Sequence, residues 1–136
     1  MVRKSKRTQL DRSSFAKFLK VSNNFEEGAL IAYEFEYYNA AGVLIVHAAI
    51  ALGDALTIKT GGVKCAGENH YEIINLIREK IEDDALRTKA LIQLEAIISH
   101  KNAVSYSGDI YNRKDLDKMF KHFERFSSWA NKILNS

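Results

Sequence analysis

The sequence predicts an all-α protein, an antiparallel up-and-down bundle of four main helices plus one short helix. Three observations support this fold class. The 136 residues include no proline, so nothing forces a long helix to end. Apolar residues recur at spacings of three and four along most of the chain. Glycines are concentrated between Gly53 and Gly67, and the short connections elsewhere favour antiparallel neighbouring helices.

Two long helices are predicted in the first half of the chain. The first runs from about Ser13 to Tyr38, with apolar residues on one face at Phe15, Phe18, Leu19, Phe25, Ala29, Tyr33 and Tyr37. The second runs from about Asn39 to Lys59 and is apolar nearly all round, with many alanines and glycines. We expect this second helix to be central, because its small side chains let neighbouring helices pack closely.

The second half begins with the connection TGGVKCAGEN, followed by a short helix at about Tyr71 to Lys80. Asp83 or Asp84 is expected to cap a helix that lasts until about Tyr106. Asn112 is the expected N-cap of the last helix, with Asp115 in its first turn. The last helix has the clearest amphipathic stripe of the chain, formed by Leu116, Met119, Phe120, Phe123, Phe126, Ala130, Ile133 and Leu134.

Composition predicts one globular domain over residues 11–136, since hydrophobic and charged residues occur in ordinary proportions. A single cysteine, Cys65, excludes an internal disulfide and a multi-thiolate zinc site, and fits a reducing compartment. The basic N-terminus leads into polar sequence, and the longest apolar run contains His47. We therefore expect a cytoplasmic protein with no membrane partner.

The net charge of +3 is concentrated at the N-terminus, where Arg3, Lys4, Lys6 and Arg7 lie in the first seven residues. The rest of the chain is close to neutral. Residues 1–10 are expected to form a basic, flexible arm. Such an arm is often only a solvated tail, although it can attract phosphates.

A few polar residues interrupt the apolar stripes. His47 and Asp54 are seven residues apart and share a face of the central helix, while Lys101 continues the stripe of the fourth helix. Asn102 and Tyr106, four residues apart, share an adjoining face of the same helix. Buried Asp and Lys residues need partners, so these five residues form a candidate cluster. The alternative is that each lies near a helix end, half-exposed and hydrated.

Three stretches, EYYNAAGVLIVHAAIALGDAL, GENH and ISHKNAVSYSG, followed by a strongly amphipathic last helix, resemble the HEPN superfamily of small helical nucleotide-binding proteins. The resemblance covers most of the chain. It implies a homodimer, because active HEPN ribonucleases pair an Arg, a polar residue such as Asn, and a His from two chains across a cleft. The positions in this chain that align with these three residues are Lys101, Asn102 and Tyr106. Asn102 fits the pattern, whereas Lys101 and Tyr106 depart from it.

Both departures weaken the case for catalysis. Metal-independent RNA cleavage needs a group that transfers a proton near neutral pH, a task that suits histidine better than tyrosine. Lysine supplies charge but lacks the bidentate fork of arginine. His100 could replace the missing catalytic histidine, but it precedes Lys101 and points about 100° away around the helix, which argues against this role. His70, at the start of the short helix, is a further candidate for reaching the site, although a histidine there is more often a local hydrogen-bonding residue.

Other chemistries have less support. The connection TGGVKCAGEN has glycines and Lys64 but lacks the ending of a phosphate-binding loop and follows no predicted strand. His47, Asp54 and His70 lack the close spacing of metal ligands, so we predict no metal and no cofactor.

The sequence leaves three functions open. The first is a HEPN-like protein that binds nucleotides or RNA through Lys101, Asn102, Tyr106, Asp54, His47 and His70, with little or no ribonuclease activity. Such a protein fits a toxin-antitoxin or defence pair with a nucleotidyltransferase-type partner. The second is a dimeric structural or protein-interaction module without ligand chemistry. The third is a weak metal-independent ribonuclease that uses Lys101 and Tyr106.

Overall fold

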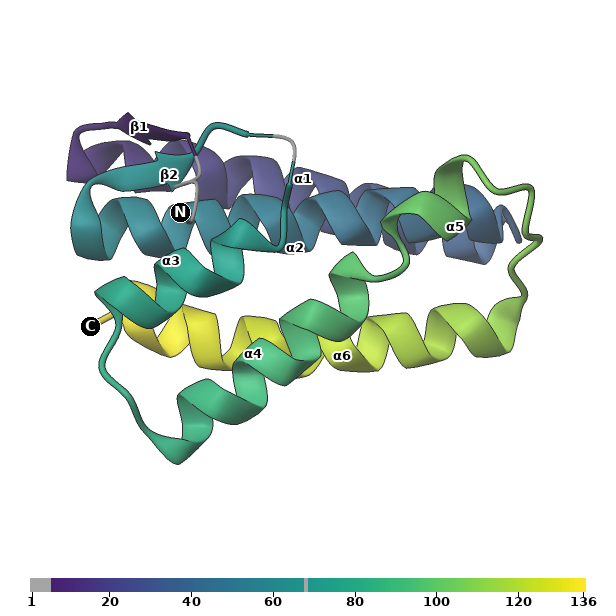
Figure 1. Cartoon of the computed structure of the whole chain (residues 1–136). Coiled ribbons are helices and arrows are strands. Elements are labelled where there is room, and N and C mark those ends of the chain that lie inside the picture. The colour runs from purple at the N-terminus through teal and green to yellow at the C-terminus, as the bar shows by residue number, and fades with distance from the viewer. Residues whose placement is uncertain (1–5, 68) are drawn as a thin grey trace.

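The computed structural model describes residues 6–67 and 69–136, and these residues are mostly helical with one small antiparallel sheet (Figure 1). The elements, in chain order, are β1 (Arg7–Gln9), a 3-10 turn (Arg12–Ser14), α1 (Phe15–Glu34), α2 (Tyr38–Gly61), β2 (Val63–Cys65), α3 (Glu72–Lys80), α4 (Ala85–Ile98), α5 (Lys101–Ser105) and α6 (Arg113–Leu134). The predicted all-helical class is correct apart from the sheet.

Helix α2 is the centre of the fold, as its composition predicts. It runs antiparallel to α1 on one side and contacts α3, α4, α5 and α6 on the others (Figure 1). Two of its glycines allow this close packing. A Cβ atom on Gly42 would lie 2.6 Å from Cγ1 of Val104 in α5, and one on Gly53 would lie 2.8 Å from Cγ2 of Ile73 in α3. Both distances are shorter than real Cβ contacts, so a side chain at either position would force its neighbour to shift.

The length and apolar character of α2 also match those of a membrane-spanning helix. Its most apolar window has a mean hydropathy of 1.9, but 83% of that window is buried inside the protein. The core helix of a soluble protein has the same properties, so α2 is weak evidence for a membrane.

The expected fourth helix is interrupted, which corrects the prediction of one helix up to Tyr106. Helix α4 ends at Ile98, and the separate helix α5 starts at Lys101. At the break, the Ser99 hydroxyl donates to the Ala96 carbonyl at 2.6 Å, and the His100 N–H donates to the Ile97 carbonyl at 3.1 Å. These bonds to the third preceding residue tighten the last turn of α4 and change the chain direction. Lys101 therefore does not continue the stripe of α4.

The small sheet was not predicted. β1 pairs with β2 in antiparallel register, with Thr8 opposite Lys64. The Arg7 guanidinium also forms a bidentate ion pair with Glu79 of α3, with both N–O distances at 2.8 Å. The expected flexible arm over residues 1–10 is thus corrected for residues 7–9, while residues 1–5 lie outside the described residues.

The predicted caps of the later helices are present. Asn112 and Asp115 form a reciprocal capping box at the start of α6, with N–O distances of 2.9 and 3.0 Å. Of the two aspartates proposed for α4, Asp84 is the N-cap, and its carboxylate accepts from the Arg87 N–H at 2.6 Å.

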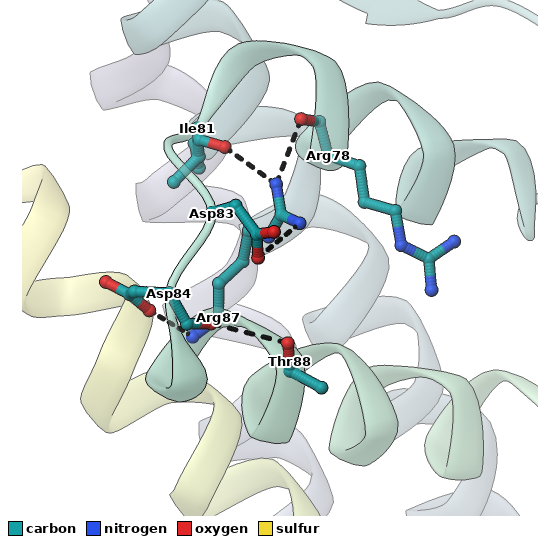
Figure 2. A network of polar contacts seen from close by, with 6 residues as sticks. All are labelled: Arg78, Ile81, Asp83, Asp84, Arg87 and Thr88. Atoms are coloured by element: carbon teal, nitrogen blue, oxygen red, sulfur yellow. Dashed lines mark hydrogen bonds and ion pairs between the residues drawn. The ribbon is translucent and has the colours of Figure 1, made fainter.

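The α3–α4 connection is held by the Arg87 side chain (Figure 2). Its Nη1 donates to the carbonyls of Arg78 and Ile81 at 3.1 and 3.0 Å, and its Nη2 pairs with Asp83 at 2.8 Å. Arg87 therefore joins the end of α3 to the start of α4.

Asn39 of α2 holds the other long connection, between α5 and α6. Its Nδ2 donates to the carbonyls of Val104 and Asp109 at 3.2 and 2.8 Å, and its Oδ1 accepts from the Tyr111 N–H at 2.9 Å. These three bonds fix both ends of the connection, and with them the position of α5.

Candidate functional site

A pocket of about 200 Å³ lies where the start of α3 meets the joint between α4 and α5. It is lined by Asn69, His70, Tyr71, Ile98, Ser99, Lys101 and Asn102. Three of the residues predicted from the sequence, His70, Lys101 and Asn102, are therefore brought together. Asn69 and His70 meet Lys101 and Asn102 here although the two pairs lie about thirty residues apart in the chain.

Local structure on both sides shapes this pocket. On the α3 side, the Asn69 side chain accepts from the Tyr71 N–H at 3.2 Å, and the His70 carbonyl accepts from the Ile73 N–H at 3.2 Å. On the other side, Ile98 is buried, and the turn that follows it places Lys101, half-buried, at the first position of α5. The break between α4 and α5 therefore turns Lys101 into the pocket.

His47 of α2 lies within electrostatic range of Lys101. Its imidazole is half-buried and packs against Phe25, with ring centroids 5.6 Å apart. Burial lowers the pKa of His47, and the charge of Lys101 lowers it further. Both effects favour the neutral form of the His47 imidazole.

Tyr106 does not share the pocket. Its side chain is 80% exposed, and it is absent from the residues that line the pocket. Lys101 and Tyr106 are the two catalytic candidates from the sequence, and a single chain does not bring them into a common pocket. The exposed phenol remains accessible to a second molecule.

Asp54 is buried on α2, and among the described residues no ion pair joins its carboxylate to Lys101. Its side chain is only 8% exposed, and burial raises its pKa to about 6, with Lys64 of β2 acting in the opposite direction. Lys64 lies on the sheet that the sequence did not predict, so the charge that faces Asp54 was missed for the same reason.

Two further histidines lie outside this pocket, namely His100 at the break between α4 and α5 and His122 in α6. His100 Nδ1 is 2.6 Å from the Tyr111 hydroxyl, and His122 Nδ1 is 2.5 Å from Oε1 of Gln93. Burial is the main cause that lowers the pKa of both imidazoles. His100 is not among the pocket residues, in keeping with its predicted direction.

Asn69, Tyr71 and Ser99 line the pocket but were not singled out from the sequence. Their residue types are common at helix ends, and only the contact between distant segments distinguishes them. Over residues 6–67 and 69–136, no group of three or more His, Cys, Asp or Glu side chains is arranged to hold a metal ion.

No protein-family model matches the chain, and no curated protein or solved structure matches it either.

Proposed function

We propose that the chain is a HEPN-like up-and-down helical bundle that binds nucleotides or RNA, with little or no ribonuclease activity. The observation that carries this proposal is the pocket in which Lys101, Asn102 and His70 meet. A cation, an amide and an imidazole, set beside an exposed aromatic ring, are the groups that recognise phosphate and base.

Each group has a distinct role in this proposal. The Lys101 ammonium attracts a phosphate as a point charge. The Asn102 amide both donates and accepts, so it can bond to a base edge. Tyr71, 45% exposed, offers a ring on which an unstacked base can lie.

The size of the pocket favours one unit of a longer ligand. Its volume of about 200 Å³ is below the roughly 300–1,000 Å³ of sites that enclose a whole small molecule. A single base or phosphate of an RNA strand fits this space, and the rest of the strand would lie on the surface.

Weak catalysis follows from the same geometry. Tyr106, at the position of the catalytic histidine, is exposed and outside the pocket, and a phenol transfers protons poorly at neutral pH. The ribonuclease alternative would therefore require a second chain to bring Tyr106 to the Lys101 of its partner. A homodimer, a nucleotidyltransferase-type partner, a defence role and a cytoplasmic location belong to this proposal as well.

The second candidate is a dimeric interaction module. It is favoured by exposed apolar side chains on and just after α1, namely Val21, Leu30, Ile31, Phe35 and Tyr37. Phe35 and Tyr37 stack on each other with centroids 6.4 Å apart. Side chains of this kind gathered on one helix are typical of a protein interface.

One titration distinguishes the three functions. Purified protein is added to labelled single-stranded RNA, and the same mixtures are run on native and denaturing gels at several salt concentrations. The proposal predicts a shifted band on the native gel that weakens with salt, and intact RNA on the denaturing gel. RNA cleavage that disappears in Tyr106→Phe would establish the ribonuclease instead.

Absence of both binding and cleavage at micromolar protein would favour the interaction module. Sedimentation of the protein alone then tests that function. The module predicts a dimer that Ile31→Glu dissociates, whereas Lys17→Glu, an exposed charge change on the same helix, leaves the dimer intact.

A further inference from the structure

A second and larger hollow lies between α4 and α6, which contact each other along antiparallel paths (Figure 1). Its volume is about 430 Å³, and it is lined by Leu86, Lys89, Ala90, Ile92, Gln93, Arg125, Ser128, Trp129 and Lys132. We refer to these nine residues as the α4–α6 groove. It shares no lining residue with the pocket at Lys101, so nothing that follows depends on the proposed function.

The two walls of the groove have the same spacing. Helix α4 contributes positions 86, 89, 90 and 93, with Ile92 beside them, and α6 contributes positions 125, 128, 129 and 132. Each set follows the i, i+3, i+4, i+7 pattern of one helix face, so the groove is a seam about two turns long. Ala90 and Ser128 are small and lie in the middle of their walls, which makes the seam hollow.

Large apolar side chains of the groove are exposed to solvent. Leu86 and Ile92 are 61% and 60% exposed, and Trp129 is half-buried between them and the core. Large apolar side chains at this level of exposure are typical of recognition surfaces. A half-buried tryptophan at the floor of such a groove is a frequent anchor of protein contacts.

The charged side chains that line the groove have a single sign. Among its lining residues, the charged ones are Lys89, Arg125 and Lys132, and all three are basic. The adjacent surface of α6 carries Lys121 as well as one acidic residue, Glu124. An occupant of this groove therefore has an apolar side and carries negative charge at its edges.

We propose that the α4–α6 groove binds an amphipathic helix of a partner protein, with an apolar face in the hollow and Asp or Glu residues along its flanks. A third helix that packs in this groove has the same residue spacing as α4 and α6. Its side chains at i, i+3 and i+7 would enter the hollow between Leu86 and Trp129. Acidic flanks pair with Lys89 on one wall and with Arg125 and Lys132 on the other.

The charge pattern argues against a second copy of this chain as the occupant. Two-fold pairing of identical grooves would place Lys89, Arg125 and Lys132 of one chain against the same cations of the other, and like charges repel. The apolar floor argues against RNA, whose phosphates prefer polar and cationic contacts. The binding energy of a helix would instead come mainly from the apolar lining residues. The three cations would favour a helix with acidic flanks.

The fluorescence of Trp129 reports on the groove directly, because it is the only tryptophan in the sequence. The probe is a synthetic helical peptide of about 14 residues with leucines at i, i+3 and i+7 and glutamates on both flanks. A matched peptide carries lysines in place of the glutamates. We expect the acidic peptide to change Trp129 emission saturably, more weakly as salt rises, and the basic peptide to bind at least about tenfold more weakly.

Protein variants complete the test. Lys89→Glu combined with Arg125→Glu should lower the affinity for the acidic peptide by at least about tenfold and raise the affinity for the basic peptide. Ser128→Leu should block both peptides by filling the hollow. Lys17→Glu, a matched charge change on α1, should alter neither affinity. Thermal unfolding of each variant confirms that the groove is intact.

Four results would overturn the proposal. The first is no change in Trp129 emission with the acidic peptide up to about 1 mM. The second is equal binding of the two peptides, which would indicate a merely apolar surface. The third is a change in Trp129 emission with protein concentration alone, which would assign the groove to a second copy. The fourth is a response of Trp129 emission to single-stranded RNA, or to decanoate as a fatty-acid probe, without a response to the acidic peptide.

Discussion

Lys101 of α5 and His47 of α2 lie close enough for the ammonium charge to act on the imidazole, and this charge adds to burial in lowering the pKa of His47. Removing the charge while keeping a long polar side chain should therefore raise that pKa. We expect Lys101→Gln to raise the His47 pKa and Asn102→Ala to leave it unchanged. An NMR titration of the histidine C–H resonances, with His47→Gln to assign the signal, measures both effects.

The same NMR titration can also contradict the contact between Lys101 and His47. An unchanged His47 pKa in Lys101→Gln would mean that the Lys101 side chain points into solvent rather than into the fold.

The close contact between α2 and α5 makes Gly42 a sensitive position. A Cβ atom there would lie 2.6 Å from Val104, whereas a Cβ atom on Gly28 of α1 would lie 3.4 Å from Leu44, an ordinary contact. We expect Gly42→Ala to lower the free energy of unfolding by about 1–3 kcal/mol and to weaken RNA binding, because α5 is displaced. Gly28→Ala should gain up to about 1 kcal/mol from helix propensity.

Chemical denaturation and RNA titration of these two variants provide the measurement. The account of α5 fails if Gly42→Ala is as stable as Gly28→Ala, since the helices would then have room to separate.

The buried carboxyl of Asp54 predicts a stability that depends on pH. Burial raises its pKa from 3.8 to about 6, so the folded protein holds this proton more tightly than the unfolded chain. Stability from this group is fully present below about pH 4 and is lost as pH rises to about 6, by at most about 3 kcal/mol. Asp54→Asn, which cannot ionise, should remove this loss and be more stable at pH 7.

Urea denaturation of both proteins across this pH window checks the sign. A variant that is less stable than the parent at pH 7 would indicate that Asp54 is ionised and paired with Lys64 in the folded state.

At the α3–α4 connection, we expect mutation of Arg87 to destabilise the protein more than mutation of its partner Asp83 (Figure 2). Its side chain is 12% exposed and donates to two backbone carbonyls, whereas its partner Asp83 is 76% exposed. Arg87→Ala should lower the free energy of unfolding by about 2 kcal/mol, because both carbonyls lose their charged donor. Asp83→Ala should cost less than about 1 kcal/mol, as exposed ion pairs usually do.

Arg87→Lys is the matched control for charge. A lysine at this position keeps the charge but cannot span the same three acceptors, so it should not restore stability. Full stability in Arg87→Lys would show that charge alone holds the connection.

The sequence predicts the helices well because their signals are local. Asn112 and Asp115 are three residues apart, and the capping box they form needs no other part of the chain. The apolar character of α2 likewise determines its central position. Each of these features depends on residues within one or two helical turns.

Features that depend on distant segments could not be predicted in the same way. The β1–β2 sheet requires Thr8 to meet Lys64, and neither strand alternates clearly enough to be recognised alone. The break at Ser99 and His100 contains no glycine or proline, so periodicity continued through it. That break ends α4 at Ile98, so Lys101 begins a separate helix instead of continuing the stripe of α4.

The central claim is that Lys101 in its pocket binds the phosphate of RNA. The most direct measurement is the anisotropy of a labelled single-stranded RNA titrated with the parent protein, with Lys101→Ala, and with Lys118→Ala, an exposed lysine of α6 outside that pocket. We predict that Lys101→Ala weakens binding at least about tenfold and flattens its salt dependence, with an unchanged melting temperature. An equal affinity of all three proteins would contradict the claim.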